Sequence, residues 1–358
     1  MEKFIDFINS YMQGYFGILL ELLGILLGAA LLYFVRGKST TISTNPLPQK
    51  TGRNPAGDMM KGLAIHAVVI IHIDSYFRYF HPQGMELTLF LANIARFAVP
   101  WFIISSAMFL KWKEGYWQAK LANLVVPYVV ISIAAYFVKY GFTQGWLADL
   151  VFRLATGSVF TPYYFVPLLL QFYLLYALVF RHFEPGAWHL FAAFVLNLLS
   201  NHLLVALLGK NPFSASLFTN YIFFFVLGLV LKQRLDKLQF DKKLPLFAVL
   251  FYLATLGHGT WHFSYEAPNH YLFYPAILFV LLPAVLKNRH SFWLELTGRY
   301  SLGIFLLHPF VIHFMHSFDP FVLGGAFAAW FATLALNMAV PVAVWSLYEY
   351  ALGKFKAR

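Results

Sequence analysis

Residues 61–74 read KGLAIHAVVIIHID, an apolar run that carries one lysine, two histidines and one aspartate. An ionisable side chain inside a bilayer is costly unless it faces protein or water, so each one marks a candidate functional position. Lys61 and His72 are eleven residues apart, which puts them on one face of a helix about 16 Å apart along its axis. The stretch therefore predicts a membrane helix with a polar track on one face.

The rest of the chain has the composition of a membrane protein. It has 358 residues, of which 60% are hydrophobic and 11% charged, and its mean hydropathy is +0.66. Soluble domains are about 45–50% apolar and about 25% charged, which excludes a soluble globular enzyme. Disorder is excluded for the same reason, because so apolar a chain cannot stay wet. Cysteine is absent, so disulfides, thiolate metal sites and a cysteine nucleophile are excluded together.

Apolar stretches long enough to cross about 30 Å of hydrocarbon recur along the whole sequence. We count eleven, at approximately 14–35, 60–77, 88–110, 121–140, 160–180, 188–208, 217–231, 244–261, 271–286, 298–317 and 325–350. The expected fold class is all-α, a polytopic transmembrane helix bundle with about 11 spans in the lipid bilayer. An N-terminal anchor and polar tether are predicted over residues 1–58, and a ten-helix membrane domain over residues 59–358.

The basic residues indicate how this bundle is oriented. The net charge of +11 comes from 26 Lys and Arg against 15 Asp and Glu. The cations form short clusters between apolar runs rather than a solvated face, which argues against nucleic acid as a partner. One set of alternate loops holds 20 of them and the other set five, and the basic loops of a membrane protein are cytoplasmic. We therefore expect a multi-pass protein of the cell (inner or plasma) membrane, with the N-terminus outside and the C-terminus in the cytoplasm.

Segments of the sequence, in order, resemble the acyltransferase family 3 membrane proteins. Residues 61–72 are similar to the family's opening Arg-Gly-Leu-Ala and apolar run to a His, with Lys61 in place of the usual Arg. Residues 96–108, RFAVPWFIISSAM, resemble its Arg-Phe-Ala-Val-Pro segment, with Ala107 in place of a Gly. Residues 301–309, SLGIFLLHP, resemble its Ser-Leu-Gly-Ile-Tyr-Leu-Leu-His-Pro. The aromatic stretch from Tyr163 is a weaker match, without the family's His, and the whole resemblance covers roughly residues 60–350.

The resemblance implies an O-acetyltransferase. The family moves an acyl group, usually acetyl from acetyl-CoA on the cytoplasmic side, to a hydroxyl of a sugar, glycan or lipid-linked acceptor at the other face, as in polysaccharide modification. Acyl-CoA is then the donor, and no metal is expected. The alternative is a glycan or lipid-linked sugar transporter or flippase without acyl chemistry, since an aromatic, polar-lined bundle suits transport as well. An inactive family member that serves as a membrane partner is a third interpretation.

His72, Arg96 and Ser106 are the catalytic candidates. A neutral imidazole can take the proton of a sugar hydroxyl as it attacks a thioester, so His72 is the expected general base, and a role as acyl carrier stays open. Arg96 and Ser106 lie on the next predicted helix and can neutralise a donor phosphate or the developing oxyanion. Lys61 and Arg96 are also the candidates for donor binding, because a phosphate held at the mouth of the track lies within reach of His72 through a flexible arm.

Asp74, Tyr164 and His308 are the candidates for binding the acceptor. Asp74 points away from His72 on a regular helix and is expected at the outer exit. Tyr164 belongs to an aromatic stretch that suits sugar stacking or the interfacial belt. His308 precedes Pro309, and its plainer role is to satisfy polar groups at a kink. His66 lies about 120° around the helix from His72, and a structural role is predicted for it.

Two further groups of His, Asp and Glu residues have spacings that could suit a metal ion. The first recurs every four residues and consists of His258, His262, Glu266 and His270. Glycines and a proline within that segment argue against the continuous helix that such a site needs. The second, His313, His316 and Asp319, is expected at an outer helix end, where interfacial contact or glycan binding fits better. We therefore predict no metal site.

Overall fold

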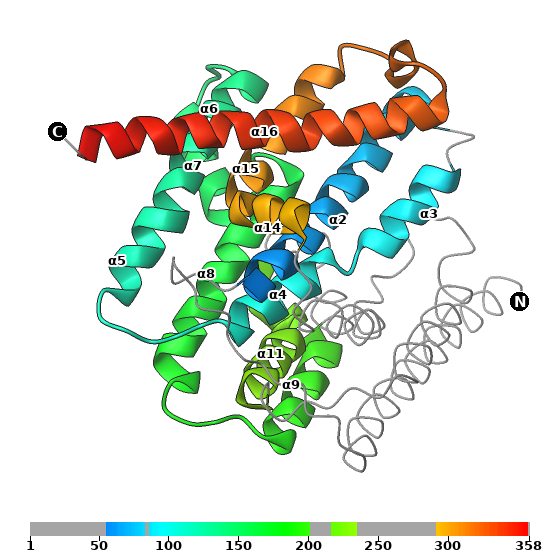
Figure 1. The fold of residues 1–358 in the computed structure, drawn as a ribbon. Helices are drawn as coiled ribbons and strands as arrows, with labels where there is room; N and C mark the ends of the chain where they lie inside the picture. The colour runs from blue at the N-terminus through cyan, green and yellow to red at the C-terminus, as the bar shows by residue number, and fades with distance from the viewer. Residues whose placement is uncertain (1–54, 83–85, 201–215, 235–290, 357–358) are drawn as a thin grey trace, which may run out of the picture.

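The computed structural model describes residues 55–82, 86–200, 216–234 and 291–356. Within these ranges the chain folds into helices and short turns, with no strand. The all-α class is therefore confirmed. Figure 1 shows the helices as one bundle, with the last helix lying across the others.

The helices follow one another with short connections. The first half contains α2 (Pro55–Phe80), α3 (Glu86–Ala95), α4 (Ala98–Met108), α5 (Tyr116–Lys120), the π turn η2 (Leu121–Val125), α6 (Val126–Tyr140) and α7 (Trp146–Thr156). The second half contains η3 (Thr161–Tyr164), α8 (Phe165–Leu175), η4 (Tyr176–Phe180), α9 (Ala187–Leu199), η7 (Phe218–Asn220), α11 (Ile222–Arg234), α14 (Phe292–Arg299), α15 (Ser301–Met315), η9 (Pro320–Leu323) and α16 (Ala326–Lys356).

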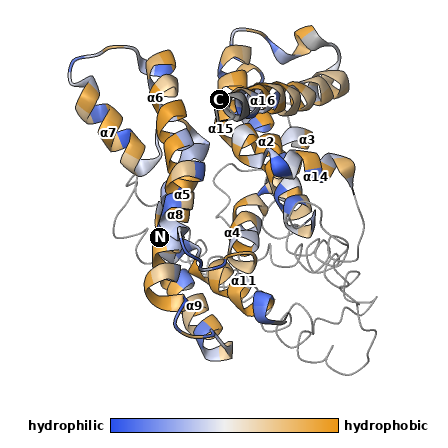
Figure 2. Ribbon diagram, turned by 60° about the vertical axis from the view of Figure 1, so that its left-hand side comes forward, coloured by the Kyte–Doolittle hydropathy of each residue, from blue (hydrophilic) through white to orange (hydrophobic). Residues whose placement is uncertain are grey.

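Several of these helices can cross a membrane by length and composition. Four are long and apolar enough: Pro55–Phe80, Tyr116–Tyr140, Thr161–Phe180 and Ala326–Ala351. Shorter apolar helices cover Ala98–Met108, Ala187–Asn197, Ile222–Gln233 and Ser301–Met315. The predicted spans 14–35, 244–261 and 271–286 lie outside the described residues, so the count of about eleven stays a prediction. Figure 2 shows hydrophobic residues along the length of α6, α8 and α16, as expected where helices face lipid.

The structure differs from the predicted spans in two places. The stretch 88–110 is not one helix, because a turn at Arg96 and Phe97 separates α3 from α4. Helix α7 has no counterpart among the predicted spans. It is only eleven residues long and carries Asp149 and Arg153, so a search for long apolar runs passes over it. Its exposed apolar side chains, Leu147 and Val151 among them, mark it as an amphipathic surface helix.

Helix α2 is the hub of the packing. It contacts α3, α4, α14, α15 and α16, and half of its 26 residues are buried. Small residues permit these close approaches. A methyl group added at Gly62 would fall on the Leu294 carbonyl, and one added at Gly298 would fall on the Asp58 carbonyl. On the other side of the bundle, a methyl at Gly228 would lie 2.7 Å from the Ala107 side chain, so α4 and α11 also meet closely where Ala107 stands.

Gly298→Ala is predicted to destabilise the fold, because the backbone of α2 occupies the space that the added methyl needs. Overpacking of this kind costs about 1–3 kcal/mol, and thermal unfolding of the detergent-solubilised protein measures it. Gly325→Ala is the control, since nothing lies within 4 Å of a methyl group there. Equal melting temperatures for the two variants would contradict the close crossing of α2 and α14.

Candidate active site

Two histidines from different helices face each other in the middle of the bundle. His72 lies on α2 and His308 on α15, and their ring centroids are 5.2 Å apart. His308 is fully buried, whereas His72 is partly exposed. The structure therefore brings together the predicted base and one of the predicted acceptor-binding residues, which are 236 positions apart in the sequence.

The backbone around Pro309 fixes the His308 ring. Its Nδ1 donates to the Ile304 carbonyl at 2.8 Å, so in the neutral ring Nε2 carries the lone pair. This Nε2 atom is buried and has no hydrogen-bond partner. His308, predicted to bind the acceptor or else to satisfy polar groups near Pro309, does bond the helix backbone through Nδ1. The opposite nitrogen stays available for chemistry.

Tyr163 bonds the same part of α15, and the sequence did not predict this contact. Its side chain is fully buried, and its hydroxyl donates to the Leu306 carbonyl at 2.6 Å. This bond joins the turn η3 to α15 at a carbonyl two residues before His308. The sequence has three consecutive aromatic residues at 163–165, and it did not show which of them is important. Tyr164, the predicted acceptor-binding residue, is partly buried on the same turn, η3.

His66 has a structural role in this arrangement. Its Nδ1 donates to the Gly62 carbonyl at 2.7 Å, and its Nε2 accepts from the Trp293 indole at 2.8 Å. Both ring nitrogens are therefore used, and the ring pins α14 to α2. This agrees with the predicted difference between the two histidines of α2.

Asp74 faces α3 rather than the histidine pair. Its Oδ2 accepts from Arg78 Nε at 3.1 Å and its Oδ1 from Thr88 Oγ1 at 2.8 Å. The carboxylate is 2% exposed, and the charge of Arg96 also acts on it. Asp74 therefore does not orient His72, and an acceptor hydroxyl would have to share its oxygens with these donors.

A basic cluster lies at the Lys61 end of α2. It consists of Lys61, Lys113 and Lys120, because the charges of Lys61 and Lys113 both act on Lys120. Lys120 also lies over the Tyr173 ring, with Nζ 3.7 Å from its centroid. Lys61 is 41% exposed and lies 3.9 Å from Asp58 Oδ1. A surface where lysines converge in this way suits a ligand with several phosphates.

Ser106 lies near the basic cluster and not near Arg96. Its hydroxyl is close to that of Tyr173, whose ring carries Lys120. Arg96 lies in the turn before α4 and Ser106 near the end of that helix, so the two are about 15 Å apart along its axis. One oxyanion cannot contact both residues, although the two ends of an extended donor can.

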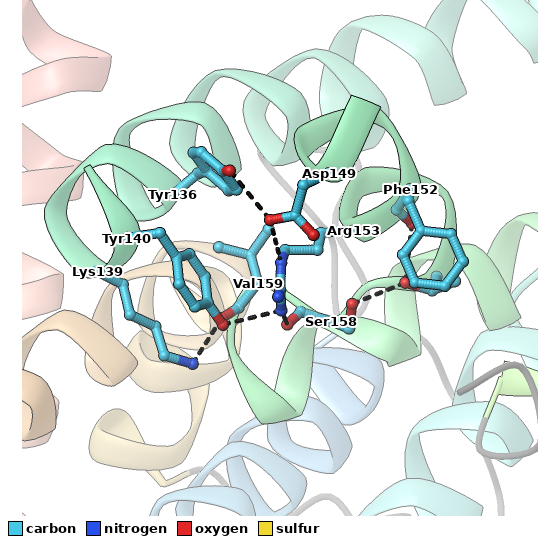
Figure 3. A network of polar contacts seen from close by, with 9 residues as sticks. Tyr136, Lys139, Tyr140, Asp149, Phe152, Arg153, Ser158 and Val159 are labelled. Atoms are coloured by element: carbon cyan, nitrogen blue, oxygen red, sulfur yellow. Dashed lines mark hydrogen bonds and ion pairs between the residues drawn. The ribbon is translucent and has the colours of Figure 1, made fainter. Parts of the chain in front are cut away.

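A polar network on α6 and α7 holds the loop that leads to Tyr163 (Figure 3). Arg153 Nε donates to Asp149 Oδ2 at 2.8 Å, and Arg153 also donates to the Tyr140 hydroxyl at 2.9 Å. Lys139 Nζ donates to the Val159 carbonyl at 3.0 Å. The hydrogen bond from Arg153 lowers the pKa of the Asp149 carboxyl. The network therefore fixes residue 159, four positions before Tyr163.

Residues of the second group whose spacing was weighed for a metal, His313, His316 and Asp319, have separate partners in the structure. Asp319 Oδ2 bonds His81 Nε2 at 2.8 Å, while His316 bonds its own helix at the Ile312 carbonyl. In the ranges that the structure describes, no group of three His, Asp or Glu side chains can hold a metal ion. The segment with His258, His262, Glu266 and His270 lies outside those ranges.

The structure is thus a helical membrane bundle in which α2 carries a basic cluster at one end and, further along, His72 beside the buried His308. A family model described as an acyltransferase domain matches residues 54–346. The chain therefore belongs to acyltransferase family 3, as the motifs predicted. The match includes Lys61, His72, Arg96, Ser106 and His308, and so covers the candidate site from end to end.

One curated relative matches over a large part of the chain. A protein named serine/alanine racemase from Enterococcus gallinarum is 25% identical over 305 residues, which cover 74% of this chain and 42% of the racemase. The chain thus spans about two fifths of that relative's length. No solved structure matches.

Asp149→Asn is predicted to lower the melting temperature at neutral pH and to have no effect in acid. A carboxyl whose pKa is lowered on folding stabilises the fold above its ordinary value of 3.8, and this contribution is lost as the pH falls through the lower folded value. The difference in melting temperature between wild type and variant should therefore shrink below about pH 4. Glu184→Gln, on an exposed turn outside the network, is the control. A difference that persists at the lowest pH would show that the charge of Asp149 is not what matters.

Proposed function

We propose that this protein transfers an acyl group, acetyl in the simplest case, from acyl-CoA to a hydroxyl of a sugar, glycan or lipid-linked acceptor. One observation carries the proposal: α2 joins a basic cluster at one end to the His72–His308 pair inside the bundle. Membership of acyltransferase family 3 supports an acyltransferase. The identity of the donor and the acceptor is our inference.

The basic cluster is the proposed site for the phosphates of coenzyme A. Lys61, Lys113 and Lys120 converge there, and the cytoplasm supplies the donor on the side where the basic loops are expected. The distance from Lys61 to His72 along α2 is about 16 Å, which the flexible pantetheine arm of coenzyme A can span. The thioester would then lie at the histidine pair.

The proposed reaction needs one base and one stabilised leaving group. The acceptor hydroxyl oxygen attacks the thioester carbonyl carbon while His72 takes the hydroxyl proton. The carbon–sulfur bond breaks, the acyl group stays on the acceptor oxygen, and the leaving thiolate takes the proton from His72. The products are the acyl ester and free coenzyme A, and both histidines end the cycle neutral.

His308 has a definite part in this scheme. Its Nε2 atom is an acceptor without a hydrogen-bond partner, and its ring centroid lies 5.2 Å from that of His72. When His72 becomes an imidazolium it gains a second N–H donor, and His308 can accept from it. Arg96 lies before the N-terminus of α4, where its own charge and the helix dipole both favour an anion, so it is the proposed stabiliser of the oxyanion.

His72→Ala should abolish acyl transfer, because removal of a general base typically costs 10²- to 10⁴-fold in rate. His308→Ala should lower the rate in the same direction, by the loss of the group that accepts from the charged His72. Membrane vesicles supplied with acetyl-CoA labelled in the acetyl group measure incorporation into saccharide. His66→Gln is the control on the same helix and should retain transfer. Unimpaired transfer in the His72 variant would remove the proposed base and favour a transporter without acyl chemistry.

Lys61→Ala should raise the apparent KM for acetyl-CoA with little change in kcat, since a phosphate contact contributes uniform binding. A hydrogen bond to a charged group is worth about 1.5–3 kcal/mol, which is on the order of ten- to a hundredfold in affinity. Lys61→Arg should be tolerated, because it keeps the charge and adds a second donor. An unchanged KM in the alanine variant would leave Lys61 as a topological anchor only.

A further inference from the structure

Two polar side chains on α16 are buried without the hydrogen bonds that their position calls for. Thr333 and Asn337 are both fully buried, and neither Thr333 Oγ1 nor Asn337 Oδ1 has a partner. In the interior of a membrane protein an unsatisfied polar atom is expensive, and each one calls for an explanation. The two residues are one helical turn apart, so they lie on one face of α16.

The orientation of the Asn337 amide follows from its neighbours. Nδ2 donates to the Thr333 carbonyl at 2.9 Å and lies 3.5 Å from Met315 Sδ. A flipped amide would set its oxygen against that carbonyl, so Oδ1 is the free atom. Pro341 lies four residues further along α16 and has no N–H to bond the Asn337 carbonyl. This position thus offers two acceptor oxygens and the hydroxyl of Thr333.

His308 and Met315 lie on the same face of α15. The two residues are seven positions apart, which is two turns and about 10 Å along the helix. Met315 touches Asn337, whereas His308 faces His72. Helices α2, α15 and α16 contact one another in pairs, and Figure 1 shows α16 lying across α15. His308, Thr333 and Asn337 therefore belong to two helices that, with α2, form one three-helix junction.

This junction extends from the histidine pair away from the basic cluster. Tyr76, fifteen residues beyond Lys61 on α2, bonds the Phe318 carbonyl and packs against His316. The Met315 end of α15 is therefore beside the end of α2 that is opposite to Lys61. A molecule that binds Thr333 and Asn337 would approach His72 from the side opposite to the donor.

We propose that Thr333 and Asn337 bind hydroxyl groups of the acyl acceptor, a sugar or another polyol, and hold it so that one hydroxyl reaches His72. The proposal rests on the acyl transfer proposed above. Acceptor oxygens are what a polyol satisfies best, because each of its hydroxyls brings a donor. The distance of about 10 Å from Met315 to His308 suits a sugar that spans the two positions.

Thr333→Val gives the sharpest test, because it keeps the shape and removes only the hydroxyl. Vesicles with labelled acetyl-CoA are assayed for labelled saccharide, which reports transfer, and for labelled acetate, which reports hydrolysis. We expect the ratio of saccharide to acetate to fall roughly three- to tenfold in Thr333→Val, as for one lost hydrogen bond. Asn337→Leu should lower the ratio at least as much. The melting temperature of ligand-free Thr333→Val should be equal or higher, since the variant removes an unsatisfied buried polar atom.

Thr297→Val is the matched control. Thr297 is also fully buried, but its hydroxyl donates to the Trp293 carbonyl at 2.8 Å. This variant should lower the melting temperature and leave the ratio of saccharide to acetate unchanged. A ratio unchanged in both Thr333→Val and Asn337→Leu would overturn the inference while the proposed function stands. Wild-type vesicles that form neither product would overturn the proposed function, and the inference with it.

Discussion

The contact between α2 and α15 is the interaction on which the site depends. It places His72 against His308, and two further hydrogen bonds hold the turn of α15 that carries His308. The His308 ring bonds the Ile304 carbonyl and the Tyr163 hydroxyl bonds the Leu306 carbonyl. The hydrogen bond to the Ile304 carbonyl therefore fixes the orientation of the His308 ring.

The sequence predicted those parts of the site that follow from helical periodicity. His66, His72 and Asp74 lie on three different directions of one regular helix, and the structure gives them three different neighbours: Trp293, His308 and Thr88. The prediction from helical periodicity was wrong where the predicted helix is interrupted by a turn. The turn at Arg96 divides a predicted span, so the position of Arg96 relative to Ser106 followed from the structure alone.

Contacts between distant segments explain what the sequence missed. Tyr163 matters because α15 passes beside it, 143 residues later in the chain. Thr333 and Asn337 could have been noticed in the sequence, since a threonine and an asparagine one turn apart are unusual in an apolar helix of 31 residues. That pattern shows only that the helix has a polar face. The packing against α15 shows which residues that face meets.

The polar atoms of the bundle fall into two kinds with opposite consequences. The polar atoms of Asp74, His66 and Arg153 are paired within the protein, and these pairs connect helices. The free atoms of His308, Thr333 and Asn337 contribute nothing to the ligand-free fold and cost stability there. All three lie on α15 and α16, beside the helix that carries the basic cluster. A hydroxyl bound at this junction would recover the hydrogen bonds that folding left unmade there.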